Sequence, residues 1–529
     1  MEMKNPFRAQ EVEKAARKLK NNKSPGIDEL NAELIKHAPQ QIYGKIAEIL
    51  NETAKTGICP KEINLGVLIP IKKPGKDKNK PDSYRPIILF SILRKILAII
   101  ILERIYERIV QHIPQSQAAY KKGRSTTEQI LTMKILAERA INSKDNELTI
   151  TLLDMSKAFD NINRENLMID LSLILEPDEL HIISLLINET ILKVKSGNTL
   201  GLDIKTNKGV PQGDSISPVL FTLYLAKTLD KVKYNPNENI NEIESNFYYH
   251  NHKSIEDHNY NKVLKPEYCI NEQYADDIAI LSSNRNYQRK IVQEIEISLN
   301  DRDLNLNKDK TECYYVSNRN KEEKWKNCKY LGSLLGTKED FDRRKTLALN
   351  AFNNKRKLLT SVQLSVKTKI RIFKAYVEPI FLYNSQLWNV NKTMNKNIDS
   401  FQRRLLRQIL RIFYPKKMNN EKVMKITKQE PWSLTIKKKR LSLLGHILRL
   451  DSKTPIRQSL KIADKNIKMR KGRKSNSWIN TVNKDLQDCK VNLKVLDIET
   501  SKLANNREEW RKLAISLEDV EYRNDTCNV

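Results

Sequence analysis

Two short stretches of sequence decide the fold. The first is Leu148-Thr149-Ile150-Thr151-Leu152-Leu153-Asp154, and the second is Gln273-Tyr274-Ala275-Asp276-Asp277-Ile278-Ala279-Ile280-Leu281. Each is rich in apolar and β-branched residues, which is typical of a buried strand, and a polar pair interrupts the second. We therefore expect one strand that ends on Asp154, and a hairpin that turns at Asp276 and Asp277.

The segments around these strands extend them into a sheet. A helix is predicted from about Arg164, a second one over Ile291 to Leu299, and a further strand over Thr311 to Val316. The order strand, helix, hairpin, helix, strand is the pattern of a split βαβ sheet with helices on one face. The sequence therefore predicts an α+β fold.

The N-terminal part has its own pattern. Ala9 to Lys20 predicts a helix, Asp28 is placed to cap a second helix, and Gly66 to Pro70 predicts a strand. A basic loop over residues 72–80 and an apolar helix that ends near Val110 come next.

Residues 231–266 differ from their surroundings because they are rich in Asn, His and Ser and hold few large apolar side chains. We interpret them as an exposed insertion. His250, His252 and His258 lie in it, and a solvated loop is favoured there over a metal site. From about residue 337 onward the chain looks helical and strongly basic.

The amino-acid composition indicates what kind of partner the chain binds. Of 529 residues, 94 are Lys or Arg and 64 are Asp or Glu, which gives a net charge of +30. A surplus this large points to a polyanion such as nucleic acid. The longest apolar run, Ile96 to Leu102, is far shorter than the about 20 residues of a spanning helix, and no signal peptide is recognisable. Six scattered cysteines without a CxxC pair favour reduced thiols, so we expect an intracellular protein, nuclear or cytoplasmic, without a membrane partner.

Three carboxylates carry the chemistry. In a split βαβ sheet the end of the first strand and the hairpin turn lie side by side, so Asp154, Asp276 and Asp277 are expected to converge. Clustered carboxylates repel one another unless cations neutralise them. Mg²⁺ prefers oxygen ligands, and two such ions about 3.5–4 Å apart can activate a hydroxyl and stabilise a leaving pyrophosphate. The pattern favours nucleotidyl transfer over the alternative, in which the Asp-Asp pair is only a surface turn.

The same residues resemble a known family. Tyr274-Ala275-Asp276-Asp277 is similar to the signature turn of reverse transcriptases, residues 152–160 to their first aspartate motif, and residues 209–218 to their nucleotide-binding motif. Further matches to reverse transcriptases of non-long-terminal-repeat (LINE-like) retrotransposons lie at residues 23–28, 84–87, 117–126, 307–312 and 329–332. Weaker resemblance continues to Trp478.

The resemblance implies a role for several individual residues. It implies that Asp154, Asp276 and Asp277, with the Met155 carbonyl, bind two Mg²⁺ ions, for which Mn²⁺ can substitute. Phe159 would exclude a 2′-hydroxyl, unless it is only a core aromatic. The nucleotide-binding candidates are Arg85 on the triphosphate, Gln212 and Gly213 near the nascent base pair, and Lys310 as a proton donor to pyrophosphate. A surface ion pair is the alternative for Arg85 and a solvated lysine for Lys310. Lys72, Lys73 and Arg124 are candidates for a basic patch only.

A basic helix is predicted independently of the family. In Phe401 to Phe413, Arg403, Arg407 and Arg411 are spaced i, i+4, i+8 and would form one stripe that tracks a duplex backbone. The alternative is a solvated helix face. Lys437-Lys438-Lys439-Arg440 would add to this patch. Acidic residues further on, such as Asp485 and Asp488, are expected on a solvated helix face.

The predicted architecture is a right hand of fingers, palm and thumb with a basic helical C-terminal extension. The expected boundaries are fingers at 1–125, palm at 126–230 and 267–336, insertion at 231–266, thumb and connection at 337–450, and extension at 451–529. The expected activity is RNA-directed DNA synthesis with an RNA template, a DNA primer, target DNA and deoxynucleoside triphosphates. The sequence shows no endonuclease motif, so a nicking activity would be supplied in trans. The competing classes are a non-catalytic nucleic-acid binder, an intron maturase, a viral RNA replicase and a basic scaffold for RNA packaging.

Overall fold

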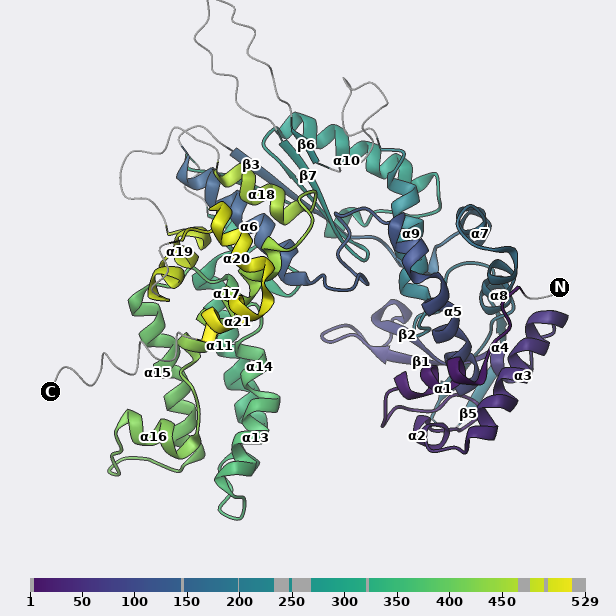
Figure 1. The fold of residues 1–529 in the computed structure, drawn as a ribbon, viewed down its shortest axis with the longest axis horizontal. Helices are drawn as coiled ribbons and strands as arrows, with labels where there is room; N and C mark the ends of the chain where they lie inside the picture. The colour runs from purple at the N-terminus through teal and green to yellow at the C-terminus, as the bar shows by residue number, and fades with distance from the viewer. Residues whose placement is uncertain are drawn as a thin grey trace, which may run out of the picture.

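The computed structural model describes residues 4–143, 147–197, 199–232, 247–249, 268–319, 323–464, 476–489 and 493–515. Most of the expected insertion at 231–266, including its three histidines, lies outside these residues. The described part is an α+β protein with three regions (Figure 1). One mixed region contains the N-terminus, a sheet region lies between, and a helical region carries the C-terminal half.

The N-terminal region combines a small sheet with helices. Its sheet has the order β2-β1-β4-β5, and β1 runs parallel to β4 and antiparallel to β2. The strands are β1 (Leu65–Lys72), β2 (Tyr84–Leu89), β4 (Ile191–Ser196) and β5 (Thr199–Lys205). The helices are α1 (Ala9–Lys18), α2 (Ala32–Lys36), α3 (Gln40–Thr56), α4 (Lys61–Asn64), η1 (Pro81–Ser83) and α5 (Ile92–Gln111). β4 and β5, which lie far along the chain, therefore complete a sheet begun by β1 and β2.

The expected cap at Asp28 was wrong. α2 begins after Asn31, and the Asp28 carboxylate instead accepts a hydrogen bond of 2.7 Å from the backbone N–H of Ile92. Asp28 therefore satisfies a free N–H at the start of α5, because the chain folds back and brings the two segments together.

The central sheet has the order β6-β7-β8-β3-β9, and all its neighbouring strands are antiparallel. The strands are β3 (Glu147–Leu153), β6 (Phe247–Tyr249), β7 (Tyr268–Tyr274), β8 (Asp277–Ser282) and β9 (Glu312–Ser317). The hairpin of β7 and β8 and the strands β3 and β9 were predicted from the sequence, whereas β6, which lies within the expected insertion, was not. Register pairs Leu153 with Ile278, which places the end of β3 beside the start of β8.

The helices of this region are α6 (Thr126–Asn142), α7 (Arg164–Ser172), α8 (Pro177–Asn188), α9 (Ser217–Leu229) and α10 (Arg285–Asn300), with η2 (Ala158–Asp160), η3 (Lys308–Lys310) and η4 (Lys324–Asn327). A short hairpin of β10 (Lys329–Tyr330) and β11 (Ser333–Leu334) follows. The expectation of helices on one face of the central sheet was wrong. Ile278 and Ile280 pack into the core that contains α9 and α10, whereas Ala279 and Leu281 pack into the core that contains α6. Both faces are covered because the four successive residues Ile278 to Leu281 of β8 are all apolar.

The described elements after residue 336 are all helical, as the sequence predicted. They are α11 (Thr337–Asn354), α12 (Arg356–Leu359), α13 (Val366–Tyr376), α14 (Glu378–Phe381), η5 (Ser385–Leu387), α15 (Lys392–Ile409), α16 (Asn420–Thr427), α17 (Trp432–Leu448), α18 (Pro455–Asp464), α19 (Trp478–Asp488), α20 (Ile498–Asn505) and α21 (Arg507–Ile515). Helices α11 to α17 surround an aromatic core in which Phe381 stacks on Trp432 with ring centroids 4.5 Å apart.

The last helices share a core with the central sheet. Trp478, Leu486 and Trp510 belong to the same buried cluster as Ile130 of α6 and Leu148 of β3. Figure 1 shows these helices, in yellow, gathered around α6 and α17. No helix among the described residues is long and apolar enough to cross a bilayer. The described cysteines, Cys59, Cys269, Cys313, Cys328 and Cys489, are all free thiols.

Candidate active site

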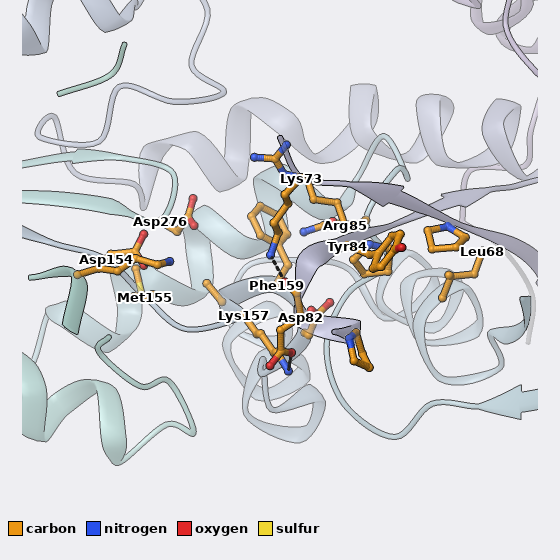
Figure 2. A pocket seen from close by; sticks show the side chains of 17 residues that line it. Leu68, Lys73, Asp82, Tyr84, Arg85, Asp154, Met155, Lys157, Phe159 and Asp276 are labelled. Carbon is orange, nitrogen blue, oxygen red and sulfur yellow. Dashed lines mark hydrogen bonds and ion pairs between the residues drawn. The ribbon is translucent and has the colours of Figure 1, made fainter. Parts of the chain in front are cut away.

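The predicted carboxylates meet at one edge of the central sheet. Asp154 directly follows β3, Asp276 lies in the turn between β7 and β8, and Asp277 is the first residue of β8. Because β3 and β8 are neighbours, the end of one strand lies beside the start of the other. Asp154 and Asp276 line the same pocket and lie near each other in Figure 2.

The hairpin turn is held by a side chain that the sequence analysis gave no role. Gln117 accepts a 3.0 Å hydrogen bond from the backbone N–H of Ala275 and donates one of 3.2 Å to its carbonyl. Ala275 has a φ of 55°, a left-handed conformation in which a residue other than glycine is strained. Gln117 is fully buried, so it fixes this turn and with it the position of Asp276. Its place in the resemblance at residues 117–126 was the only signal in the sequence.

Charge repulsion is visible at the carboxylates. Burial, followed by the charges of Asp276 and Asp154, raises the pKa of Asp277 from 3.8 to about 6. Burial and then the charge of Asp154 raise the pKa of Asp276 in the same direction. The Lys310 ammonium, from η3, lies 2.7 Å from Asp154 Oδ2 and compensates part of this negative charge. The site therefore disfavours its own ionised form and is suited to a further cation.

The donors fit a divalent metal in chemistry. Carboxylate oxygens on two adjacent strands are the ligand type that Mg²⁺ prefers, and their raised pKa values show that a cation would relieve repulsion. In the part of the chain that the structure describes, no group of three or more His, Cys, Asp or Glu residues is arranged as a ready metal cage. Asp154 is bound by Lys310 instead, so a metal would have to compete with this ammonium.

A pocket of about 570 Å³ opens beside the carboxylates (Figure 2). One wall comes from β1, β2 and the loop between them, and includes Lys73 and Arg85. The other wall comes from the segment after β3 and includes Phe159. Arg85 is exposed and forms no ion pair or hydrogen bond among the described residues, so its guanidinium is free to take a ligand. Lys73 donates a 2.9 Å hydrogen bond to the Asp82 carbonyl.

The Phe159 ring lies partly in the core and partly at the pocket, so it meets both alternatives that the sequence analysis considered. Its ring stacks on Phe221 of α9, with centroids 4.4 Å apart and an interplanar angle of 21°. It also lines the pocket and is only half-buried. One side of the ring is therefore anchored in the core, and the remainder faces the pocket.

The segment at Gln212 and Gly213 packs against β2. The Gln212 carbonyl accepts a 2.8 Å hydrogen bond from the Ile88 N–H, and Gln212 lines the pocket. Gly213 has a φ of 121°, and a Cβ built there would lie 2.5 Å from the Ile88 carbonyl oxygen. Glycine is therefore required here by the close approach to β2 of the same chain. Next to it, Asp214 forms a fully buried 3.0 Å ion pair with Arg94 of α5, which the sequence analysis did not foresee.

Several members of the two predicted basic patches are not exposed, although Lys72 and Lys439 are. The Arg124 side chain is buried and forms a 2.6 Å ion pair with Glu128, whose other oxygen lies 2.9 Å from His446 Nε2. Arg440 is fully buried and ion-pairs with Asp485 of α19, which itself was expected on a solvated face. Lys437 pairs with Asp488 at 3.2 Å, and Lys438 pairs with Glu430. Arg440 and Lys437 join α17 to α19 through partners from a distant segment, whereas Arg124 and Lys438 pair with residues close to them in the sequence.

The predicted arginine stripe does not form. α15 ends at Ile409, and Arg411 lies beyond it with a φ of 58°, so Arg411 does not continue the helical face. Arg407 donates hydrogen bonds to the Met418 carbonyl and to Asn420 Oδ1, at 3.2 and 2.7 Å. It therefore holds the turn into α16. Arg403 is half-buried.

Comparison with known proteins gives a consistent result. A family model described as reverse transcriptase (RNA-dependent DNA polymerase) matches residues 71–335. The chain is 25% identical over 439 residues to a protein of Drosophila melanogaster named as a probable RNA-directed DNA polymerase from transposon BS. It is 26% identical over 437 residues to the RNA-directed DNA polymerase from mobile element jockey of Drosophila funebris. Each alignment covers 76% of this chain and 44% of the relative, so the chain spans less than half the length of these curated relatives.

Among solved structures, apo telomerase from Candida tropicalis matches with a TM-score of 0.40 and 13% identity. The match covers 90% of this chain and 74% of that chain. A TM-score this low carries no argument about function.

Proposed function

The chain belongs to the reverse transcriptase (RNA-dependent DNA polymerase) family, and we propose that it extends a DNA 3′-hydroxyl on an RNA template, as the polymerase of a LINE-like retrotransposon. The observation that carries this proposal is the pocket beside Asp154 and Asp276. It joins carboxylates at a sheet edge to an unpaired arginine and a partly exposed aromatic ring within one cavity. A nucleoside triphosphate needs these groups: oxygen ligands for its metal ions, a fork of donors for its phosphates and a surface for its sugar.

Asp154, Asp276 and Asp277, with the Met155 carbonyl, would hold two Mg²⁺ ions, or Mn²⁺ in their place. When bound, such ions lower the pKa of an attacking hydroxyl and neutralise charge on a leaving pyrophosphate. The protein's contribution is to fix the carboxylates on two hydrogen-bonded strands and, through Gln117, to fix the turn that bears Asp276.

The other pocket residues would bind the nucleotide. Arg85 would take the triphosphate through a bidentate contact, since its planar fork matches phosphate oxygens. The free part of the Phe159 ring would lie under the sugar and exclude a 2′-hydroxyl. Gln212 would contact the nucleotide from the opposite wall, with Gly213 permitting the tight packing behind it. Lys310, already held by Asp154, would donate a proton to pyrophosphate.

The regions are proposed to act as fingers, palm and thumb with the boundaries expected from the sequence. The fingers sheet would also include β4 and β5. The partners would be an RNA template, a DNA primer, target DNA and deoxynucleoside triphosphates. The nick that creates a primer in target DNA is proposed to come from an endonuclease acting in trans.

Primer extension on an RNA template tests this function. The wild type should extend an annealed DNA primer in Mg²⁺, and Asp276→Asn should not. Asp301→Asn, which removes an exposed carboxylate at the end of α10, is the matched control and should remain active. If wild type and Asp276→Asn both fail to extend but bind RNA equally, the chain is a non-catalytic binder or packaging scaffold. Extension with ribonucleotides instead would indicate an RNA replicase.

A further inference from the structure

A second groove lies in the helical region, between α11 and α15 and the loop that follows α15. It has a volume of about 1010 Å³, compared with about 570 Å³ for the pocket beside Asp154. The two cavities share no lining residue. In Figure 1, α15 and α16 lie beyond α13 and α14 as seen from the N-terminal region.

The groove is strongly cationic. Lys345, Arg356, Arg404 and Arg407 line it, whereas Asp342 is its one acidic lining residue. Lys345, Arg356 and Arg404 are exposed and form no ion pair among the described residues. This differs from α17, where Arg440 and its neighbouring lysines are paired within the protein. Unpaired cations that line a groove attract a polyanionic backbone.

Two aromatic side chains stand exposed at the same groove. Phe413 is 50% exposed and Tyr414 is 91% exposed, and both line it. Two neighbouring aromatic rings that are open to water beside a cationic groove offer flat apolar surfaces that a ligand can cover. Bases of a single strand stack on such rings with little regard to sequence.

The loop that presents these rings is anchored. Arg407, from the last turn of α15, donates its hydrogen bonds to Met418 and Asn420, on the far side of the loop. Asn419 then caps α16 by accepting a hydrogen bond from the Lys422 N–H at 2.9 Å. Both ends of the loop are therefore fixed, and the aromatic pair is held over the groove rather than free to swing away.

We infer that this groove binds a short run of single-stranded nucleic acid, with the backbone along Lys345, Arg356 and Arg404 and bases stacked on Phe413 and Tyr414. A duplex fits these features less well, because its bases are already stacked on each other and only its phosphates face outward. The same chemistry suits single-stranded RNA and single-stranded DNA. The site is separate from the proposed polymerase pocket and would exist even if that pocket were inactive.

The test uses the full chain and fluorescein-labelled eight-nucleotide strands, oligo(U) and oligo(dT), with an eight-base-pair duplex as a third arm. Tyr414→Ala should weaken binding of a single strand by about fivefold or more, which is the size of one base–aromatic stack, and Tyr414→Phe should restore it. Arg404→Ala and Arg356→Ala should each reduce the log–log salt slope by about 0.7, while Arg289→Ala, an exposed arginine of α10, should leave it unchanged. Comparing the oligo(U) and oligo(dT) arms identifies the source of the strand.

Strands that carry 5-iodouracil locate the contact directly. Irradiation followed by peptide mapping should place crosslinks on residues 411–419, and the same crosslinks should form in Asp276→Asn, which removes polymerisation without touching the groove. Equal binding by wild type and Tyr414→Ala, crosslinks confined to the pocket near Phe159, or tighter binding of the duplex would each overturn the inference. Absence of extension by the wild type, with its groove crosslinks present, would count against the proposed function alone.

Discussion

Charged side chains lie both in the pocket beside Asp154 and in the interface between α6 and the C-terminal helices. In the interface they are paired with other groups of the protein, whereas in the pocket some of them have no such partner among the described residues. In the interface, Glu138 of α6 accepts hydrogen bonds from the Trp478 N–H and from Asn389, and Arg440 pairs with Asp485. In the pocket, Arg85 has no protein partner among the described residues, and Asp276 and Asp277 repel Asp154. The type of charged residue therefore does not identify a functional site. A functional site is identified by charged groups that have no partner within the fold.

The largest effect is expected when one negative charge of the pocket is removed. Asp276→Asn should lower primer extension by about a thousandfold, because a ligand that acts on developing charge is removed. The fold should not suffer, since one source of repulsion disappears and the protein without metal should unfold at an equal or higher temperature. Extension rates and thermal unfolding in EDTA measure both. A variant that unfolds earlier than wild type would show that Asp276 has a structural partner instead.

The opposite result is expected at the interface. Arg440→Ala should lower the free energy of unfolding by about 3–5 kcal/mol, since it leaves the Asp485 carboxylate buried without its partner. Urea titration measures this loss. Extension per folded molecule should stay near wild type, and Arg440→Met with Asp485→Leu should recover much of the stability. A loss of RNA affinity without a loss of stability would instead restore Arg440 to a nucleic-acid surface.

Arg85→Ala should weaken the binding of deoxynucleoside triphosphate without changing the stability of the protein. The KM for deoxynucleoside triphosphate should rise by about tenfold or more, the size of a lost charge-assisted contact, because the phosphates lose their bidentate donor. The unfolding temperature should not change, since Arg85 has no partner to lose among the described residues. Arg85→Lys should recover only part of the affinity, because an ammonium lacks the fork. Steady-state kinetics at fixed primer concentration provides the measurement.

Phe159→Ala should show a mixture of the two behaviours, since the ring belongs to both environments. Discrimination against ribonucleotides should fall by about tenfold, and stability should fall by about 2 kcal/mol through loss of the stack on Phe221. Phe159→Tyr keeps the ring and should keep both properties. Competition between dNTP and rNTP in the extension assay separates the two effects. Unchanged discrimination with reduced stability would assign Phe159 to the core alone.

The smallest effect is expected at the mouth of the pocket. Lys157 and Asp82 form a 2.8 Å ion pair across it, with 65% and 80% of their side chains exposed. Such pairs contribute little in water, so Lys157→Ala should leave the unfolding temperature unchanged and alter the KM for nucleotide by no more than about twofold. A larger change in KM, lost in high salt, would show that this pair helps to close the pocket over its substrate.

Local pattern predicted β3, β7, β8 and β9 of the central sheet but not β6. Apolar runs ending on Asp154 and surrounding Asp276-Asp277 required strands there, and pairing of the strands brought the aspartates to one edge. Predictions from local sequence pattern were wrong where contacts with a distant segment determine burial and ion pairing. Arg440 and Asp485 read as solvated charges because each is 45 residues from its partner. Arg411 was predicted to lie on the helix, but α15 ends before it and Arg411 has a φ of 58°.

The amino-acid sequence was sufficient for the strands that bear the three aspartates, for most of the helices and for the family, because these depend on neighbouring residues and on periodicity. The tertiary structure alone decided which charges remain available. Long-range contacts satisfy Arg440 and Asp214, and leave Arg85, Arg356 and Arg404 without an ion-pair partner among the described residues. The physical reason is that a buried charge must find a counter-charge, whereas an exposed one need not, and burial is set by packing between segments far apart in the chain.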